Sequence, residues 1–283
     1  MNLNEYLKQA RKAGHAIGHF NFATADVLRA IVEGAKEAGA PAVMVGTSEG
    51  EAEFLGMAEA VALVAAMRRE FDFPIFLNAD HFKSPEKCKA AIDAGYDSVL
   101  IDTSKLPFDQ NVQAAKQVVE YARRANPDIS VEGELGYLRG SSEVQTQVQV
   151  TKDDYTQPNE AAEFISQTGV DRLAVVFGNI HGIVTEQEEK LDIAHLKMIV
   201  AAVPQKHLVL HGASGLPNEQ VSVAIKAGIV NVHFNTELRV AYKEGIEQAL
   251  QEKPSETTPY KYLAPAAEEV KKVVMEKTKI FQA

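Results

Sequence analysis

The sequence predicts a (β/α)₈ barrel in a single domain. Eight short apolar runs alternate with eight longer helix-periodic runs along the 283 residues, which is the count for this fold in a chain of about 250 residues. The apolar runs are rich in Val, Ile, Leu and Phe and end in polar residues or glycine. Strands buried on both faces of a parallel sheet have this character. No G-x-G-x-x-G follows the first run, so an open doubly wound sheet has less support.

The predicted elements follow one another in a regular order. The strands are residues 15–22, 41–48, 74–81, 97–104, 129–136, 172–179, 207–214 and 229–236. The helices that follow them are residues 25–39, 56–72, 84–95, 109–127, 159–169, 192–204, 217–228 and 238–251. Several of these helices end at glycine or at proline, and the starts "SPEK" and "LPNEQ" place a proline in the first turn.

Three segments lie outside this repeat. Residues 1–14 read as a polar amphipathic helix rather than a signal peptide, and residues 260–281 read as an additional C-terminal helix. Residues 138–160 are the longest stretch without core periodicity, and long loops in compact domains are often lids. No linker or low-complexity tract marks a second domain, so residues 1–283 are expected to form one domain.

Composition excludes some classes of function. The formal net charge of -10 argues against a long basic track for nucleic acid, although it does not exclude an anionic substrate. The single cysteine, Cys88, cannot form an intramolecular disulfide, which agrees with a reducing compartment. No apolar run is long enough to span a bilayer. We therefore expect a cytoplasmic protein without membrane or nucleic-acid partners.

Three histidines fall at matching places in the predicted barrel. His81 ends the third strand, His181 closely follows the sixth, and His211 ends the seventh. Carboxyl ends of barrel strands meet on one face, and three imidazoles that leave coordination positions open are a catalytic zinc arrangement. Imidazole also binds cobalt or iron, so the pattern predicts a divalent metal more firmly than its identity. The remaining histidines at strand starts or on helices are expected to be structural: His15, His19, His195 and His207.

Carboxylates accompany these histidines. Asp80 precedes His81 directly, and Asp102 ends the fourth strand, where it either lines the site or caps a turn. Glu132 and Glu134 share one side of the fifth strand. Two carboxylates inside a barrel are costly without a cation. At least one of them is therefore expected to bind a metal or a substrate. The alternative role for either glutamate is that of an internal ion-pair partner.

Two turns predict anion binding. "HGASG" follows the seventh strand and "NTE" follows the eighth, each before a helix. Both supply hydroxyl groups and free backbone N–H groups, and the loops after these two strands are the usual phosphate site of this fold.

Together these motifs carry a resemblance to a known family. "NADH", "VEGELG", "VFGNIHG", "LHGASGL" and "NTELR" resemble, in order, the motifs of class II, metal-dependent ketose-bisphosphate aldolases, most nearly fructose-bisphosphate aldolases. The similarity runs through the whole chain, from "GHFNF" and "TSEGE" to "YKYLAPA". It implies zinc-dependent cleavage of a ketose 1,6-bisphosphate into dihydroxyacetone phosphate and glyceraldehyde 3-phosphate.

The resemblance also implies roles for individual residues. Metal ligands are His81, His181 and His211, with Glu134 as an alternative ligand and Asp102 as an acid lining the metal site. Asp80 matches the catalytic acid/base. The phosphate and monovalent-cation region is matched by Gly182, Gly212, Ser214, Asn235 and Thr236, and residues near the substrate are matched by Asn21 and Ser48. The family further implies a homodimer or homotetramer.

Three positions depart from the family pattern. Asn78 stands where the first histidine of His-x-Asp-His is usual. Ser142 stands where a loop glutamate usually exchanges the enolate-forming proton, so Glu143, one residue later, is the candidate for that catalytic role. His233 replaces an asparagine that touches the enediolate; it either donates a hydrogen bond, contacts the metal or indicates another substrate. We expect a divergent branch of the family.

Other functions compete with this one. A Schiff-base aldolase needs a desolvated lysine, for which Lys83 and Lys105 are the nearest candidates. A zinc hydrolase and a non-catalytic sugar-phosphate binding protein are further alternatives. The choice between fructose, tagatose and other ketose phosphates depends on stereochemistry that side-chain identity does not fix.

Overall fold

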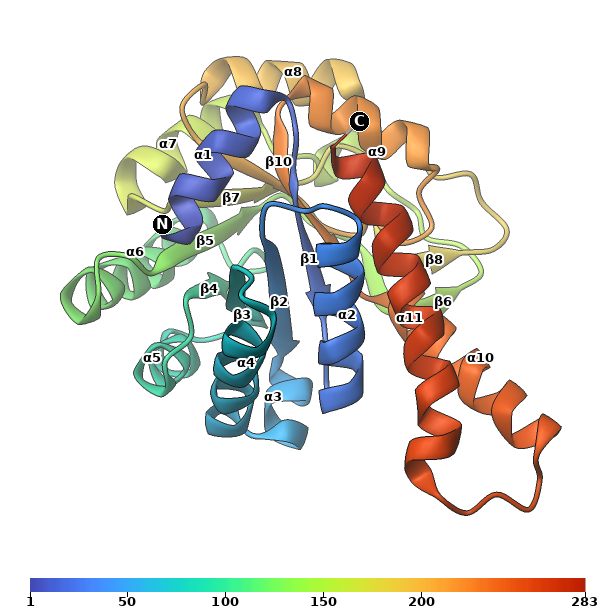
Figure 1. Ribbon diagram of the computed structural model, residues 1–283. Coiled ribbons are helices and arrows are strands. Elements are labelled where there is room, and N and C mark those ends of the chain that lie inside the picture. The colour runs from blue at the N-terminus through green and yellow to red at the C-terminus, as the bar shows by residue number, and fades with distance from the viewer. Residues whose placement is uncertain (283) are drawn as a thin grey trace.

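The computed structural model describes residues 1–282 and has the predicted barrel (Figure 1). Eight parallel strands close on themselves in the order β1-β10-β9-β7-β5-β4-β3-β2. Their bounds are β1 Ile17–Asn21, β2 Val43–Ser48, β3 Ile75–Phe82, β4 Ser98–Ile101, β5 Ser130–Leu135, β7 Arg172–Val175, β9 His207–Leu210 and β10 Ile229–Phe234. Each predicted strand region thus contains one barrel strand.

A helix follows each barrel strand. These helices are α2 Ala25–Glu37, α4 Met57–Phe71, α5 Pro85–Ala94, α6 Phe108–Ala125, α7 Pro158–Thr168, α8 Ile193–Ala202, α9 Asn218–Ala227 and α10 Thr236–Glu252. The predicted terminal helices are α1 Leu3–Ala13 and α11 Pro259–Phe281. An additional helix, α3 Glu49–Leu55, was not predicted. It begins with a capping box, in which the Ser48 side chain accepts from Glu51 N–H and the Glu51 carboxylate accepts from Ser48 N–H.

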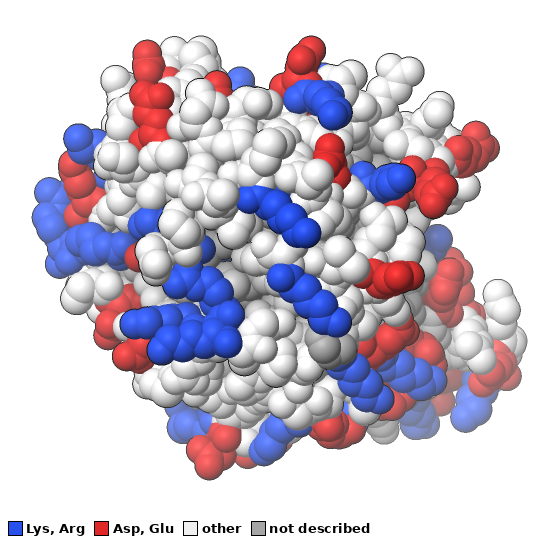
Figure 2. Space-filling view, turned by 90° about the horizontal axis from the view of Figure 1, so that it is seen from above, with Lys and Arg blue, Asp and Glu red and all other residues white. Residues whose placement is uncertain are grey.

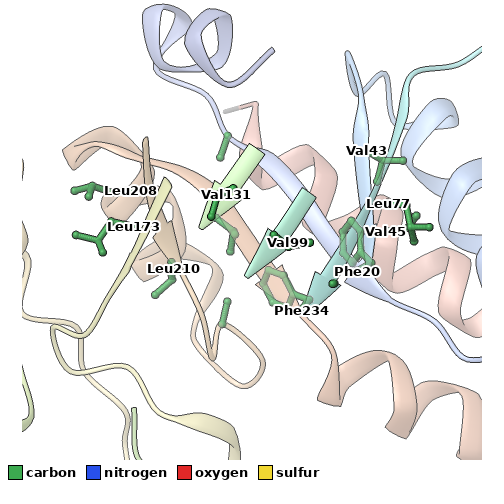
Figure 3. Close-up of a cluster of buried hydrophobic side chains, with 14 of the residues drawn as sticks. Phe20, Val43, Val45, Leu77, Val99, Val131, Leu173, Leu208, Leu210 and Phe234 are labelled. Atoms are coloured by element: carbon green, nitrogen blue, oxygen red, sulfur yellow. The ribbon is translucent and has the colours of Figure 1, made fainter. Parts of the chain in front are cut away.

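Side chains alternate along the barrel strands, and the two sides differ in polarity. Apolar side chains such as Val45, Leu77 and Val99 lie in the layer between strands and helices (Figure 3). The intervening residues point into the barrel, where Asn78, Ser98 and other polar side chains are hydrogen-bonded to one another. This period of two separates an apolar outer layer from a polar interior.

Helix α1 covers the end of the barrel where the strands begin, and the other helices pack around its sides. The α1 side chains of Leu3 and Leu7 are buried against Ile17, Met44 and Phe76 at the strand starts. Helix α11 packs against α2 and α10, and the α10–α11 hairpin projects from the barrel (Figure 1). The open end of the barrel is therefore the one at the carboxyl ends of the strands.

The surface carries charges of both signs. Seen from above Figure 1, Lys and Arg side chains are interspersed with Asp and Glu side chains, although the chain has a net charge of -10 (Figure 2). Within residues 1–282, no helix is both long and apolar enough to cross a membrane.

The predicted lid, residues 138–160, contains regular structure. Strand β6 Gly140–Gln145 pairs in parallel with β8 His181–Val184, outside the barrel, and a short 3₁₀ helix, Lys152–Asp154, follows. The Gln145 side-chain amide donates to the carbonyl oxygens of Ser141 and His181 at 2.9 and 2.8 Å. Because β6 is largely exposed, it lacks the hydrophobic alternation that marks a buried strand.

A buried acid supports the segment that precedes β8. Glu189 is 5% exposed, its Oε1 accepts from Ile180 N–H at 2.9 Å, and its Oε2 has no hydrogen-bond partner. Burial raises the pKa of Glu189 to about 8, although the bond from Ile180 opposes this shift. The folded protein therefore holds a proton here that the unfolded chain releases above its ordinary pKa of 4.5.

We expect the free energy of unfolding to fall as pH rises from about 4.5 to 8, on the order of 5 kcal/mol from this residue alone. Glu189→Gln should remove that part of the slope, measured by urea unfolding across this pH range. The exposed neighbour supplies the control, because Glu188→Gln should keep the wild-type slope. A slope unchanged by Glu189→Gln would contradict a proton bound at Glu189.

Candidate active site

The carboxyl ends of the barrel strands surround one cavity of about 570 Å³. Loops and strand ends from both halves of the chain contribute to it. The predicted site residues that line it are Asn21, Ser48, Asp80, His81, Asp102, Glu134, His181, Gly182, His211, Gly212, Ser214, His233, Asn235 and Thr236. Of the predicted site residues, Glu143 is the one outside this lining.

The three predicted histidine ligands meet in this cavity. One ligand atom from each of His81, His181 and His211 can be chosen so that all three lie within 4.8 Å of one another. The His81 ring meets the rings of His181 and His211 edge-on, with centroids 4.8 and 4.6 Å apart. Burial lowers the pKa of His181 to about 3, with a further contribution from His81. His181 is therefore held as a neutral imidazole, the form that binds a metal.

Acidic side chains surround His81. Its Nδ1 lies 3.1 Å from Asp102 Oδ2 and 3.4 Å from Glu134 Oε2. Although burial alone lowers the pKa of His81, Asp80, Asp102 and Glu134 together raise it to about 10. Burial and the neighbouring Asp102 raise the pKa of Glu134 well above its usual value. The cluster therefore favours a positive charge. In metal sites, a carboxylate typically bonds the ring nitrogen of a ligand histidine that does not bind the metal.

Glu132 takes the role of an internal ion-pair partner. Its Oε1 lies 2.7 Å from His211 Nε2, and its Oε2 lies 2.5 Å from Nη1 of the fully buried Arg172. Burial opposes ionisation, but Arg172 and His211 lower the pKa of Glu132. Glu132 therefore orients the His211 ring through Nε2. Of the two carboxylates on β5, Glu134 is the one that lines the cavity.

The backbone at the end of β3 is strained. His81 has φ of 52°, a left-handed conformation that non-glycine residues rarely adopt, and the register with β4 shifts between Ala79 and Phe82. Such strain persists where surrounding structure holds it and is common at functional sites. Here it lets the adjacent side chains of Asp80 and His81 both line the cavity.

Asp80 is held by neighbours from other strands. Its Oδ2 accepts from Asn21 Nδ2 at 3.0 Å, and its Oδ1 lies 3.3 Å from His233 Nδ1. Burial opposes ionisation, yet the adjacent His81 helps to hold the pKa of Asp80 well below its usual value. Asp80 is thus a carboxylate with one oxygen fixed and the other free of any hydrogen bond.

His19 was expected to be structural, but the structure places it beside this group. Its ring stacks on that of His233, with centroids 3.7 Å apart and planes 10° apart. Burial lowers the pKa of both histidines well below the usual value, with a further contribution from His233 at His19 and from His211 at His233. Period-two spacing with Asn21 on β1 could have revealed that His19 faces the barrel interior. Nothing around Arg172 in the sequence indicates a role in the site apart from its position in a predicted strand.

The predicted anion site lies at the ends of β9 and β10. Ser214 Oγ accepts from Glu237 N–H at 3.3 Å, and Thr236 Oγ1 lies 3.1 Å from Ser142 Oγ. Gly212 has φ of 66°, and a Cβ there would lie 1.8 Å from the Ile180 carbonyl oxygen. Only glycine fits such a position. Asn235 precedes α10 and makes no side-chain cap, so apart from Glu237 N–H, which Ser214 accepts, the first N–H groups of that helix are available for an anion.

Glu143, the candidate for the catalytic role in the loop, and Ser142, which stands at the position of the family's usual glutamate, differ in their relation to the cavity. Ser142 lines the cavity, whereas the Glu143 side chain is exposed and lies outside it. The consecutive residues Gly140, Ser141 and Ser142 line the cavity, and the pairing of β6 with β8 is irregular between Gly140 and Val144, so Glu143 lies just beyond the lining stretch. This arrangement therefore does not bring Glu143 to the site, and it brings Ser142 instead.

The donor set fits a divalent metal. Three imidazoles converge, carboxylates bond two of them from behind, and the buried Glu134 Oε2 has no hydrogen-bond partner. This combination matches a His₃ site with an adjacent acid and open positions.

Comparisons with known proteins point to one family. The family model described as "Fructose-bisphosphate aldolase class-II" matches residues 1–283. A fructose-bisphosphate aldolase from Geobacillus stearothermophilus is 35% identical over 99% of this chain and 96% of its own, and one from Staphylococcus aureus (strain Mu50) is 36% identical over the same shares.

Solved structures give the same result. The YdjI aldolase from Escherichia coli K12 superposes with a TM-score of 0.82 at 28% identity, covering 99% of this chain and 96% of that one. A putative fructose-1,6-biphosphate aldolase from Coccidioides immitis does so with 0.84 at 25% identity and the same coverage. The match over the full sequence and the closed parallel barrel show that the chain belongs to the class-II fructose-bisphosphate aldolase family.

Proposed function

We propose that the protein catalyses the reversible, zinc-dependent aldol cleavage of a ketose 1,6-bisphosphate, with fructose 1,6-bisphosphate as the first candidate. The products are dihydroxyacetone phosphate and glyceraldehyde 3-phosphate. The observation that carries the proposal is the convergence of His81, His181 and His211 next to the carboxylate of Asp80.

Asp80 acts as the base in the cleavage direction. Asn21 fixes its Oδ2, so Oδ1 removes the proton from the substrate C4 hydroxyl. The C4–O electrons form the aldehyde, the C3–C4 bond breaks, and its electron pair passes to the dihydroxyacetone phosphate half as an enolate. Bound metal supplies Lewis-acid stabilisation of the charge that develops on the ketone oxygen. In synthesis, Asp80 returns the proton to the aldehyde oxygen.

Two groups of candidate phosphate ligands lie on opposite sides of the barrel mouth. The Gly212–Ser214 and Asn235–Thr236 turns follow β9 and β10, whereas Lys83 and Lys105 follow β3 and β4 on the opposite side of the closed strand order. One phosphate of the substrate binds the turns, and the two lysines attract the other. A bisphosphate therefore spans the metal-binding histidines.

The metal requirement is tested by a coupled assay for triose phosphate, run as purified, after EDTA and after zinc is restored. We expect activity to be lost with the metal and regained with zinc, with fructose and tagatose 1,6-bisphosphates compared in parallel. Activity that persists in protein shown to be metal-free would refute the three-histidine mechanism and favour a Schiff base on Lys83 or Lys105.

Asp80→Asn should lower kcat by about 10²- to 10⁴-fold, because general-base catalysis contributes rate of this order. Zinc content, measured on the same preparation, should stay at the wild-type level. The exposed Asp109 on α6 offers a control, and Asp109→Asn should behave as wild type. Near-normal turnover of the Asp80 variant would exclude this carboxylate as the base.

Lys105→Ala should raise KM for the bisphosphate by about tenfold while kcat changes little, since an exposed lysine provides binding rather than chemistry. Fructose 1-phosphate, which lacks the distal phosphate, should be cleaved equally by variant and wild type. Lys116→Ala, on an exposed position of α6, is the matched control. An equal loss with both substrates would show that Lys105 does not bind the distal phosphate.

A further inference from the structure

A carboxylate occupies the same helix start as the proposed phosphate site. Glu237 is the second residue of α10, the helix that begins at the turn after β10. Its backbone N–H donates to Ser214 Oγ at 3.3 Å, and its Oε1 accepts from Gly215 N–H at 2.8 Å. An acid in the first turn of a helix interacts favourably with the helix dipole, but it also repels a phosphate bound at the same place.

Lys277 supplies the countercharge from the C-terminal helix. Helix α11 packs beside α9 and α10 (Figure 1). Lys277 Nζ lies 2.8 Å from Glu237 Oε2 and donates to Asn218 Oδ1 at 3.1 Å. It also lies 5.2 Å from the centre of the Phe234 ring, a distance at which a cation is attracted to an aromatic face. Contacts from α10, α9 and β10 therefore hold the ammonium group in one place.

The ion pair is shielded from solvent. The Lys277 side chain is 7% exposed, and the Glu237 side chain is 20% exposed. Because water screens such a pair weakly, the two charges interact more strongly than those of a surface ion pair. Neither side chain lines the cavity, whereas Ser214 and Thr236 do. Lys277 therefore acts on the cavity through Glu237 and through the turn that Glu237 holds.

The contacts of Glu237 also decide which groups of the turn after β9 can bind an anion. Gly215 N–H is already bonded to the carboxylate. Ser214 Oγ accepts from Glu237 N–H, so the Ser214 hydroxyl hydrogen is not used in that bond and can be donated to an anion in the cavity. Glu237 thus orients a phosphate donor, while its own charge opposes the phosphate. Neutralising the carboxylate removes this conflict.

We propose that Lys277 is a positioning residue for the substrate phosphate. It neutralises Glu237, so that this acid holds the turn after β9 without repelling the anion. The inference rests on the proposed function, because that function places one phosphate of the substrate at the turns after β9 and β10. The C-terminal helix thereby contributes to phosphate binding, although Lys277 lies outside the cavity lining.

Four zinc-loaded proteins test this inference: wild type, Lys277→Met, Glu237→Gln and the double variant. Inorganic phosphate is titrated into each by calorimetry. Lys277→Met should raise the Kd for phosphate about tenfold, because an uncompensated carboxylate repels the ion. Glu237→Gln should lower the Kd about threefold, because the ammonium charge is then unopposed. The double variant has neither charge, so its Kd should return to within about twofold of wild type.

The opposite signs separate charge compensation from a purely structural role. If the pair only attaches α11 to the barrel, both single variants should bind phosphate more weakly, and the double variant should not recover. That result, or a Kd that is the same in all four proteins, would overturn the proposal. If Lys277→Met does not fold, the tighter binding expected of Glu237→Gln remains decisive, and unchanged or weaker binding would contradict the proposal.

Lys271 offers a matched control on the same helix. Its Nζ lies 2.6 Å from Oε1 of Glu37 on α2, and its side chain is 14% exposed. Lys271→Met should leave the Kd for phosphate and the steady-state kinetics at wild-type values. In Lys277→Met, KM for fructose 1,6-bisphosphate should rise about tenfold while kcat stays within about twofold, because the phosphate is bound equally in the ground state and the transition state.

The outcomes also separate this inference from the proposed function. Cleavage by the wild type, with a phosphate Kd that does not change as expected in the variants, would overturn the role of Lys277 and leave aldol cleavage intact. Absence of cleavage, with the expected changes in the phosphate Kd, would refute the proposed reaction and support the role of Lys277. A wild-type protein that binds no phosphate would overturn the inference directly.

Discussion

A charged guanidinium inside the barrel is the constraint on which the rest of the site depends. Burying a cation is costly unless its nitrogens find partners, and Arg172 finds them on β3, β4, β5 and β10. Glu132 supplies the countercharge and also bonds His211. The same charge thus links the barrel core to a predicted metal ligand. Because Asn78, Ser98 and Ser130 are register partners, a one-residue slip of any of these strands would remove a partner and expose the charge to apolar surroundings.

Much of the fold follows from local features of the sequence. Parallel strands buried on both sides and helices ending at glycine or proline repeat regularly, and this repetition alone predicts the barrel. The β6–β8 sheet and helix α3 could not be predicted in the same way. Strand β6 is exposed and gains its stability from pairing with residues about 40 positions later, as Gly140 with His181 shows. Helix α3 begins at a capping box formed by Ser48 and Glu51, but its 7 residues are too few to show a helical apolar period.

Site residues at the ends of the barrel strands could be predicted from the fold alone. Residues whose contacts depend on the register between strands could not. Side chains at the ends of parallel strands must converge, so His81, His181 and His211 could be grouped without coordinates. The roles of His19 and Arg172 depend on which residues lie level with them on strands far away in the sequence. Glu143 could not be placed for another reason. Strand β6 is largely exposed and has no hydrophobic pattern, so the sequence does not indicate which of its residues line the cavity.

The small sheet formed by β6 and β8 connects the segment that borders the cavity to the predicted metal ligand His181. His181 begins β8, and its carbonyl oxygen accepts from the Gln145 side chain, while Ser142 on β6 contacts Thr236 at the anion site. The covering segment and the predicted metal ligand His181 are consequently parts of one small sheet. A displacement of β6 would therefore be transmitted to His181, so that access to the cavity and the position of this candidate ligand would be coupled.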